Sequence, residues 1–238
     1  MIDPMHNSLE VTHPKKPLIS VLTVVLNGEA TIRDCIESVL AQTYPEIEHV
    51  IVDGASTDMT VDILKEYGDR ISTWISEPDS GIYNALNKAL LLAKGTYYIP
   101  LGSDDVLFPA AAEQLIAYIE HHKIAMGRVQ CTGPSGRRMN IYNHSAGTLV
   151  KTDLHDALGL YDESYKIAAD TKFLEQAKHA NLINYIGQDV GKFVLGGASS
   201  NYAKTIMEHS RAMRESGSWG YVRSASWLLP RLLYAKLK

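Results

Sequence analysis

Short apolar runs alternate with amphipathic segments up to about residue 120 of the chain. Residues 18–26 are almost continuously apolar, as expected for a strand that is covered on both faces. Similar runs predict further strands at 48–52, 71–75 and 97–101. Apolar residues at helical spacing predict helices at 30–42, 58–67, 82–93 and 110–120. This order favours right-handed βαβ units, so the expected fold class is α/β with a mostly parallel sheet.

The pattern changes after about residue 125. Residues 126–142 predict a hairpin with its turn at 133–136, and residues 149–158 lead into an irregular segment rich in His and Tyr. The remaining pattern predicts helices at 170–179 and 202–215 and an extended segment at 185–195. A polar leader at 1–16 is therefore followed by an α/β half of the nucleotide-binding type and then by a mixed half.

Two helix ends carry recognisable signals. Thr57 is expected to cap the helix at 58–67, because a threonine hydroxyl can accept from an unpaired N–H of the first turn. Gly95 is expected to close the helix at 82–93 in the left-handed conformation that glycine adopts readily.

The composition narrows the class of protein. The 238 residues suffice for one large domain, and a hydrophobic fraction of 45% is ordinary for a packed core. A net charge of −4 gives no reason to expect a nucleic-acid partner. Cys35 and Cys131 form neither a metal-ligand spacing nor a disulfide framework, and the leader lacks the apolar core of a signal peptide. We therefore expect a cytoplasmic protein.

Paired carboxylates follow the predicted strand at 97–101. Asp104 and Asp105 come just after Gly102, and adjacent carboxylates repel each other unless a cation accompanies them. In open α/β sheets, ligands bind beyond the carboxyl ends of the strands. Mg²⁺ and similar cations take one or two carboxylates and leave positions for phosphate oxygens and water. The placement predicts a metal–diphosphate site, and the alternative is an Asx turn before Pro109.

Two other strand ends also carry polar side chains. Asp53 ends the second predicted strand beside Gly54 and a helix start, so it can accept from a base or ribose group or serve in a capping turn. Residues 76–88 end the third strand and open a helix with more polar side chains than a turn needs. Among them, Lys88 could meet a phosphate or lie on a solvated helix face.

Together these stretches resemble the inverting glycosyltransferases of family two, which have the A-type (GT-A) fold. The matching residues are 19–28, 38–45, 53–58 (DGASTD), 76–90 and 102–105 (GSDD). Each motif alone is weak evidence for the family, but five motifs in the family's order and at its spacing form a specific signal. The resemblance continues through residues 162–170 and fades after about residue 201. It implies a single Rossmann-like nucleotide-diphospho-sugar transferase domain with a mixed central sheet and C-terminal helices.

The resemblance implies a donor site in residues 17–125. Asp53 would bind the nucleobase or ribose of a UDP-, GDP- or dTDP-sugar, with Leu26 and Asn27 lining the same pocket. Asp79 would lie near the nucleoside, and Lys88 would join the donor site.

It also implies a metal and a general base. Asp105 would coordinate Mn²⁺ or Mg²⁺ on the diphosphate, and Asp104 beside it would contact the ribose or a metal-bound water. Ser103 departs from the family's metal motif, which often carries Asp there. Asp170 would deprotonate the acceptor hydroxyl, and in-line attack would invert the sugar's configuration. From the residues alone, Asp170 could instead cap the helix that follows it.

Residues 126–200 would form the acceptor side, where His144 could touch the acceptor or the phosphate or be structural. Residues 201–238 are expected to be helical. From Ser216 onward they contain no Asp or Glu, and Arg and Lys interleave with Leu and aromatic residues, as in an interfacial helix. Peripheral contact with the inner face of a membrane would suit a lipid-linked saccharide acceptor, and packing on the domain is the alternative.

The expected function is a metal-dependent inverting glycosyltransferase that acts in bacterial cell-surface polysaccharide or glycolipid synthesis. A nucleotidyltransferase is one alternative, although residues 26–30 lack its Gly-rich phosphate loop. A non-catalytic sugar-nucleotide-binding homologue is the other, although Asp53, Asp105 and Asp170 are all present. A dehydrogenase is disfavoured because no GxGxxG follows the first strand.

Overall fold

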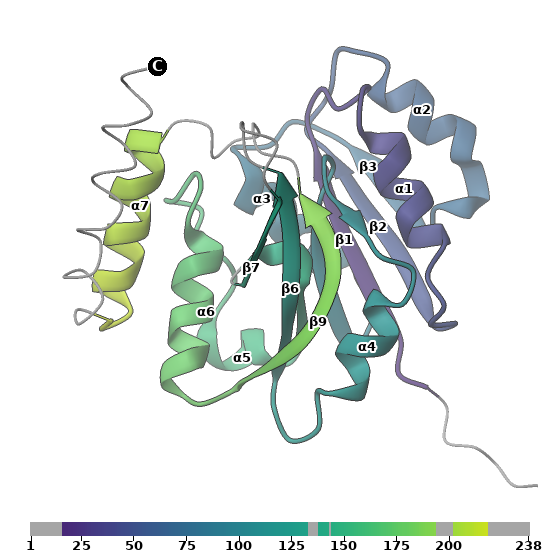
Figure 1. Ribbon diagram of the computed structural model, residues 1–238. Helices are drawn as coiled ribbons and strands as arrows, with labels where there is room; N and C mark the ends of the chain where they lie inside the picture. The colour runs from purple at the N-terminus through teal and green to yellow at the C-terminus, as the bar shows by residue number, and fades with distance from the viewer. Residues whose placement is uncertain (1–15, 133–137, 143, 194–201, 219–238) are drawn as a thin grey trace, which may run out of the picture.

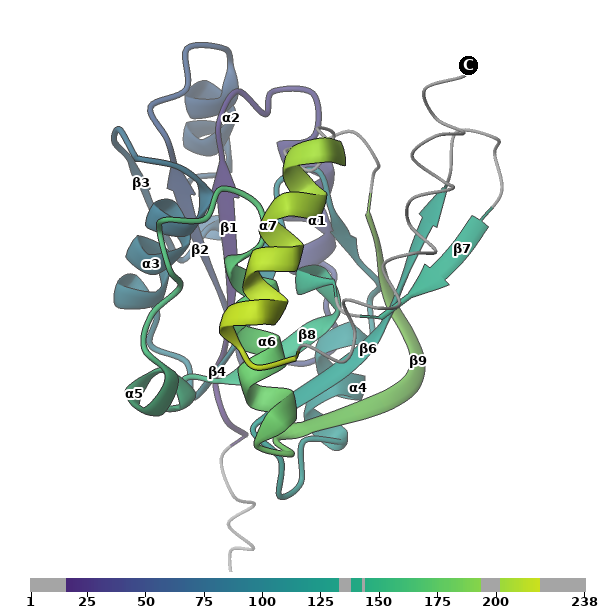
Figure 2. The same cartoon turned by 90° about the vertical axis from the view of Figure 1, so that its left-hand side faces the viewer.

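The computed structural model of the chain describes residues 16–132, 138–142, 144–193 and 202–218. Within these residues, one twisted sheet of nine strands carries helices on both faces (Figures 1 and 2). The strand order is β3-β2-β1-β4-β8-β6-β9-β5, and β7 pairs with β6. The predicted polar leader, the hairpin turn and the residues from 219 onward lie outside the described residues.

The first half alternates strands and helices as predicted. Its elements are β1 (Ile19–Val25), α1 (Ile32–Leu40), β2 (Ile47–Asp53), α2 (Thr60–Tyr67), the 3₁₀ turn η1 (Gly68–Arg70), β3 (Thr73–Ser76), α3 (Ile82–Leu92), β4 (Tyr97–Gly102), β5 (Val106–Leu107) and α4 (Ala111–Ala117). β1 pairs in parallel with β2 and β4, and β2 pairs in parallel with β3. This parallel half carries the strand ends where the candidate site residues lie.

The second half makes the sheet mixed. Its elements are β6 (Ile124–Thr132), β7 (Arg138–Ile141), η2 (Ser145–Gly147), β8 (Thr148–Lys151), α5 (Leu154–Leu158), α6 (Ala169–His179), β9 (Ile183–Phe193) and α7 (Tyr202–Glu215). β8 is antiparallel to both β4 and β6, whereas β9 is parallel to β6 and antiparallel to β5. The predicted α/β fold with a mixed central sheet and C-terminal helices is therefore confirmed.

Helices cover both faces of the sheet (Figures 1 and 2), and apolar side chains of the strands pack against them. Successive residues of a strand point to opposite faces. Leu22 of β1 therefore joins the core under α3 and α6, whereas its neighbour Val21 joins the core under α1 and α4. Tyr83, Leu86 and Leu90 follow each other at helical spacing and form the buried side of α3. Burial of one such large apolar side chain stabilises the fold by about 1.5–3 kcal/mol.

The residues predicted only to lead into an irregular segment form a strand and a helix, whereas residues 159–168 after them are irregular, as predicted. β8 lies between β4 and β6 in the middle of the sheet, and α5 begins three residues after it ends. A run of four residues such as TLVK has too few positions to distinguish a strand from a buried helix by periodicity. The local pattern did not predict this strand, because pairing with two neighbouring strands defines β8.

The predicted cap of α2 was also wrong. α2 begins at Thr60, and the amide of Thr57 donates instead to Oδ1 of Asn27 at 2.9 Å. Asp58 supplies the side-chain acceptor at the start of the helix, because its carboxylate accepts from the amide of Thr60 at 3.0 Å. The side chain that accepts a hydrogen bond at the start of α2 is thus that of Asp58, one residue after the predicted cap Thr57.

Gly95 is required for a different reason from the one predicted. Its φ is not positive, so the left-handed conformation does not explain the glycine. A Cβ atom at this position would clash with Oγ of Ser20 and lie 2.6 Å from the carbonyl oxygen of Tyr97. The close approach of two chain segments therefore demands a residue without a side chain.

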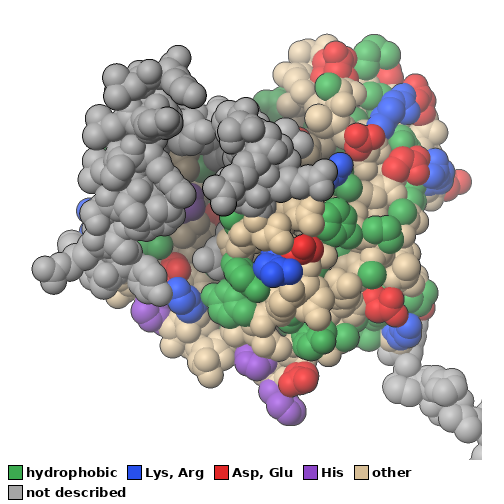
Figure 3. Space-filling model, in the orientation of Figure 1, with side chains coloured by type: hydrophobic (Ala, Val, Ile, Leu, Met, Phe, Trp, Pro, Cys, Tyr) green, Lys and Arg blue, Asp and Glu red, His purple; other side chains and the backbone are tan. Residues whose placement is uncertain are grey.

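Opposite charges lie interspersed on the face of the molecule that Figure 3 shows. Where α1 and α2 pack side by side, Arg33 pairs with Glu66, and Arg70 of η1 pairs with Glu37 at 3.1 Å. These pairs are exposed, and exposed pairs contribute only about 0–1 kcal/mol each.

Among the described residues, no helix has the length and apolar character needed to cross a membrane.

Candidate active site

Four parallel strands end at one edge of the sheet, and the predicted site residues follow these ends. Val25 of β1 is in register with Asp53 of β2, which is in register with Ser76 of β3. On the other side of β1, Val24 is in register with Gly102 of β4. The loops after these strands therefore begin side by side at the carboxyl edge, where open α/β sheets bind ligands.

Asp53 is fully buried at the end of β2. Its Oδ2 accepts from the amide of Ser56 at 3.0 Å and from the hydroxyl of Ser76 at 2.6 Å, and its Oδ1 accepts from the hydroxyl of Ser56. A buried carboxylate is tolerated only when such donors replace water. Each carboxylate oxygen has two lone pairs, so Oδ1 can accept one further donor, such as a nucleobase or ribose group, without losing Ser56.

The loop after β1 lies beside Asp53. Asn27 has a φ of 52° and donates its amide to Oγ of Ser56 at 2.7 Å, so the loops after β1 and β2 are tied together. Leu26 is 62% exposed, and its Cδ1 lies 3.5 Å from the position of a Cβ on Gly54. An apolar side chain at this place is suited to cover one face of a nucleoside.

Asp79 lies beside Gly54 as well, on the same side as Leu26. A Cβ on Gly54 would lie 2.5 Å from Oδ2 of Asp79, so only glycine allows this carboxylate to approach the end of β2. Oδ1 of Asp79 accepts from the amide of Gly81 at 2.8 Å, which shapes the turn into α3. The turn before α3 thus carries Asp79 to Gly54, the residue that follows Asp53.

Lys88 does not point into that pocket. Its ammonium pairs with Glu77 at 2.7 Å and donates to the carbonyl oxygen of Pro78 at 2.9 Å. The lysine thereby holds the turn between β3 and α3, and contact with a phosphate would require it to exchange these partners. Its predicted role in donor binding stays a prediction.

Asp104 and Asp105 converge beside the end of β4. A Cβ on Gly102 would lie 2.9 Å from Oδ1 of Asp104 and 2.9 Å from Oδ2 of Asp105. Asp105 is 5% exposed, whereas Asp104 is half-buried. Burial raises the pKa of the nearby Cys35 thiol to about 12, and the negative charges of Asp105 and Asp104 contribute to this increase. The paired carboxylates therefore form a compact centre of negative charge that a cation would neutralise.

This donor set fits a hard divalent cation. Mg²⁺ and Mn²⁺ prefer oxygen ligands, and Mg²⁺ sites commonly combine one or two carboxylates with phosphate oxygens and water. Asp104 and Asp105 turn their oxygens toward the space that Gly102 leaves open, which meets that requirement. Among the described residues, no group of three His, Cys, Asp or Glu side chains could hold a metal ion by itself. The remaining ligands would therefore come from the nucleotide and from water.

Asp170 lies in the first turn of α6 and is not its N-cap. α6 begins at Ala169, and the capping position is Ala168. Oδ1 of Asp170 accepts from the hydroxyl of Tyr83 at 3.0 Å and from the amide of Thr171 at 2.8 Å. The capping alternative is therefore wrong, and a negative charge in this first turn is favoured by the helix dipole.

His144 connects the carboxylates of the two halves. Its Nδ1 accepts from the amide of Ala146 at 3.3 Å, and its ring stacks on Phe193 with centroids 4.3 Å apart. Burial lowers the pKa of His144, while the charges of Asp170 and Asp104 oppose that shift. The ring therefore lies within electrostatic range of two carboxylates, one after β4 and one in α6.

Several partners in the site had no signal in the sequence. Ser56 and Ser76 bind Asp53, and Tyr83 binds Asp170, yet each looks like an ordinary capping or core residue in its own segment. Their contacts follow from strand register and helix packing.

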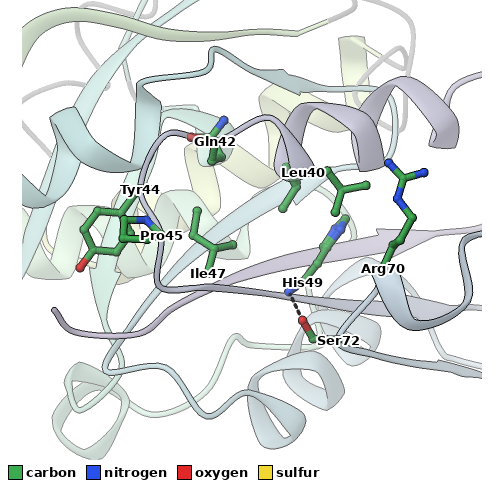
Figure 4. A pocket seen from close by; sticks show the side chains of 9 residues that line it. Leu40, Gln42, Tyr44, Pro45, Ile47, His49, Arg70 and Ser72 are labelled. Atoms are coloured by element: carbon green, nitrogen blue, oxygen red, sulfur yellow. Dashed lines mark hydrogen bonds between the residues drawn. The ribbon is translucent and has the colours of Figure 1, made fainter. Parts of the chain in front are cut away.

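A separate hollow lies at the opposite end of β2 (Figure 4). It measures about 210 Å³ and lies between the end of α1, the start of β2 and the residues before β3. His49 and Ser72 belong to its lining, and the amide of His49 donates to Oγ of Ser72 at 3.0 Å. The hollow contains none of the predicted site residues, so it is distinct from the candidate active site.

The sequence model of the family described as "Glycosyl transferase family 2" matches residues 20–179. The chain is 34% identical over 174 residues to a "PGL/p-HBAD biosynthesis glycosyltransferase" of Mycobacterium bovis (strain BCG / Pasteur 1173P2), which covers 66% of this chain and 68% of the relative. It is 30% identical over 180 residues to the "Uncharacterized glycosyltransferase RP339" of Rickettsia prowazekii. That match covers 65% of this chain and only 56% of the relative's own length.

Solved structures with the same fold include glycosyltransferases bound to sugar nucleotides. S. aureus TarS 1–349 in complex with UDP has a TM-score of 0.67 and 20% identity, and covers 84% of this chain and 65% of its own. The mannosyltransferase PcManGT from Pyrobaculum calidifontis in complex with GDP-Man and Mn²⁺ has a TM-score of 0.66 and 19% identity, with the same coverage. With the fold shared and two thirds of its length matched by the family, the chain belongs to glycosyl transferase family 2.

Proposed function

We propose that this chain is a metal-dependent inverting glycosyltransferase that moves a sugar from a nucleoside-diphosphate sugar to an acceptor hydroxyl. The observation that carries the proposal is the pair Asp104 and Asp105, whose oxygens both lie beside Gly102 where β4 ends at the carboxyl edge of the sheet. From the second half of the chain, Asp170 in the first turn of α6, bonded to Tyr83, would supply the base. Membership of glycosyl transferase family 2 supports this reaction class.

The donor is a UDP- or GDP-sugar in this proposal. TarS is described in complex with UDP and with UDP-GlcNAc, and PcManGT in complex with GDP-Man and Mn²⁺. Asp53 and Asp79 flank Gly54, with Leu26 beside it, and would hold the nucleoside. Asn27 fixes the loop that completes this pocket.

Asp105 and Asp104 would hold Mn²⁺ or Mg²⁺. A bound divalent cation acts as a Lewis acid that stabilises the negative charge on a departing diphosphate. The chain's own contribution is to place two carboxylates, one of them buried, beside Gly102 at the carboxyl edge of the sheet.

Asp170 would take the proton of the acceptor hydroxyl. The acceptor oxygen bonds to the anomeric carbon as the bond from that carbon to the diphosphate breaks, and the electron pair leaves with the diphosphate. Attack from the side opposite the leaving group inverts the configuration. We place the reaction in bacterial cell-surface polysaccharide or glycolipid synthesis, with a saccharide or lipid-linked saccharide as acceptor, on the basis of the family resemblance alone.

The test combines donor binding with turnover. The chain is screened for thermal stabilisation by UDP-GlcNAc, GDP-mannose, UDP-glucose and dTDP-sugars, with Mn²⁺ and with chelator, because a ligand of the folded state raises the melting temperature. Donor cleavage with water as acceptor then reports turnover without a known acceptor. Asp105→Asn should abolish the metal-dependent stabilisation, whereas Asp156→Asn, which removes an exposed carboxylate, should not.

Asp170→Asn separates binding from chemistry. The amide cannot take the proton, and general-base catalysis contributes about 10²–10⁴-fold, so cleavage should slow by that order while donor and metal affinity stay unchanged. Stabilisation that is equal with Mn²⁺ and with chelator would contradict the metal assignment. Stabilisation by nucleoside triphosphates alone would favour a nucleotidyltransferase.

A further inference from the structure

Tyr83 lies where α3 meets the segment that leads into α6. Its side chain is 4% exposed, and its Oη lies 2.6 Å from the carbonyl oxygen of Ile167 and 3.0 Å from Oδ1 of Asp170. A tyrosine hydroxyl has one hydrogen to donate, so two acceptors share it. Burial raises the pKa of Tyr83 well above its usual value, and the charge of Asp170 raises it further, so the hydroxyl keeps its hydrogen at neutral pH.

The hydrogen bonds to Asp170 fall on one of its two oxygens. Within the described residues, the hydroxyl of Tyr83 and the amide of Thr171 both reach Oδ1, at 3.0 and 2.8 Å. A carboxylate held through Oδ1 has a defined orientation, and Oδ2 is then presented on the other side. Oδ2 is therefore the oxygen that is suited to receive a proton.

Further contacts tie α3 and the loop before it to the segment that carries Asp170. Nζ of Lys166 donates to the carbonyl oxygen of Ser80 at 2.7 Å. The side-chain amides of Asn84 and Asn87 both donate to Glu163 at 3.0 Å. Figure 2 shows the segment between α5 and α6 running alongside α3. The turn that contains Asp79 and the segment that contains Asp170 are thus parts of one hydrogen-bonded unit.

We propose that Tyr83 is a positioning residue for Asp170, orienting it through Oδ1 so that Oδ2 faces the acceptor hydroxyl. This inference rests on the function proposed above. In the transfer step, the acceptor's proton moves to Oδ2, its oxygen bonds to the anomeric carbon, and the diphosphate leaves with the electron pair of the broken bond. Once Asp170 has become neutral, Ile167 offers the hydroxyl of Tyr83 an alternative acceptor at 2.6 Å.

A buried tyrosine that only fills the core is the competing explanation. Tyr98 provides the matched control, because it is fully buried in the same core and its hydroxyl lies 2.7 Å from Nε2 of His155 and 2.8 Å from the hydroxyl of Tyr161. Tyr83→Phe and Tyr98→Phe each remove one hydrogen-bonded hydroxyl and keep the ring. Only the first removes a partner of Asp170.

The experiment measures turnover, donor affinity and melting temperature for the wild type, Tyr83→Phe, Tyr98→Phe, Asp170→Asn and the double variant Tyr83→Phe/Asp170→Asn. Turnover is the release of nucleoside diphosphate from the donor found in the screen, with water as acceptor. Tyr83→Phe should lower kcat about 10–100-fold, the loss seen when partners that orient metal-binding side chains are removed. Donor affinity should stay unchanged. In the Asp170→Asn background, Tyr83→Phe should have no further effect, because residues that act as a unit are not additive.

Three outcomes would overturn the proposal. The first is a kcat of Tyr83→Phe that matches that of Tyr98→Phe. The second is an equal loss of kcat in the wild-type and Asp170→Asn backgrounds, which would assign Tyr83 a role independent of the base. The third is a fall in donor affinity that accounts for the whole effect. A wild-type chain that neither binds nor cleaves any nucleoside-diphosphate sugar would overturn the proposed function itself, and that result is distinct from the other three.

Discussion

At the scale of single residues, the carboxylates of the site differ in what surrounds them. Asp53 is fully buried and accepts from two serines, whereas Asp105 is 5% exposed beside Asp104. Asp170 is partly exposed and bonds to Tyr83 and to its own helix start. A carboxylate with neutral donors on every side supports the fold, while one that faces another carboxylate or an open space can bind a cation or take a proton.

Asp53→Ala is expected to weaken both the fold and donor binding. It leaves the hydroxyls of Ser56 and Ser76 and the amide of Ser56 without their buried acceptor, which costs about 1–3 kcal/mol of stability. Urea unfolding measures this loss, and Ser76→Ala, which removes one donor and keeps the carboxylate, should cost less. Calorimetry on the folded variant then measures donor affinity. An unchanged unfolding midpoint would show that these bonds do not support the fold.

Acidification is expected to destabilise the chain through His49. Burial lowers the pKa of His49 to about 3, and among the described residues its Nδ1 has no hydrogen-bond partner. In the unfolded state, His49 therefore binds a proton at about pH 6.5, whereas in the folded state it stays neutral at that pH. The neutral His49 does not reduce the free energy of unfolding above pH 6.5. As the pH drops from 6.5 toward 3, the free energy of unfolding falls by at most about 1.4 kcal/mol per pH unit.

Unfolding free energies between pH 7 and pH 4.5 test this prediction. Asp162 and Glu215 affect stability only at lower pH than this window. Hydrogen bonds lower the pKa of each carboxylate to about 2, so the stabilisation by their ionised forms is lost only below this window. His49→Gln should have a shallower pH dependence than the wild type. His121→Gln, which changes an exposed histidine, is the matched control. Equal slopes for His49→Gln and the wild type would contradict the prediction.

At the scale of elements, α7 supports the segment that carries Asp170. Glu208 of α7 accepts from the amides of Lys166 at 2.8 Å and Ile167 at 2.7 Å. Nearer the end of the helix, Glu215 accepts from the hydroxyl of Tyr165 at 2.8 Å. The backbone before α6 is neither strand nor helix, so its amides need acceptors from another element. α7 therefore holds the approach to the candidate base in place.

Ala212→Leu is expected to loosen this support. Ala212 is fully buried in α7, and extra methylene groups in a packed core cost about 1–3 kcal/mol. Stability should fall, and turnover should fall more than donor affinity, because within the described residues the hydrogen bonds of α7 reach α6 and the segment before it. Urea unfolding and donor cleavage measure the two effects. Met207→Leu, at a position that is 72% exposed on the same helix, should leave both near wild type. Normal turnover in a destabilised Ala212→Leu would show that α7 is not coupled to Asp170.

At the scale of the whole molecule, one sheet edge collects residues that are far apart in the chain. The parallel strands of the first half lead to Asp53 and Asp104, and the second half contributes His144 before β8 and Asp170 in α6. Figure 1 shows how β6 and β9 extend the sheet toward α6 and α7. The two halves share one sheet, so neither forms the site alone.

The C-terminal residues provide a prediction for the full chain, although those from 219 onward lie outside the described residues. Residues 216–238 contain no Asp or Glu and several Arg, Lys, Leu and aromatic residues, so the full chain should bind vesicles that contain anionic lipids. A variant that ends before Trp227 should remain in the supernatant and still bind the donor. Neutral vesicles and high salt are the controls, because both remove the electrostatic part of the attraction. If the intact chain does not bind anionic vesicles, the alternative is favoured, in which the C-terminal residues pack on the domain.

Much of the first half could be predicted because its information is local. The continuous apolar run at 18–26 became β1, the helical spacing at 82–93 became α3, and the segment at 202–215 became α7. Parallel strands buried on both faces and helices with one buried side both leave periods in the sequence. The paired Asp104 and Asp105 directly after such a strand could then be placed at the carboxyl edge.

The sequence by itself thus determined the order of elements, the family and the segments that face the carboxyl edge of the sheet. Only the tertiary structure decided that β8 enters the middle of the sheet, that Asp53 is enclosed by Ser56 and Ser76, and that Tyr83 holds Asp170. These features depend on strand register and helix packing between residues that are distant in sequence. Such contacts leave no local period, because each partner also satisfies the pattern of its own strand or helix.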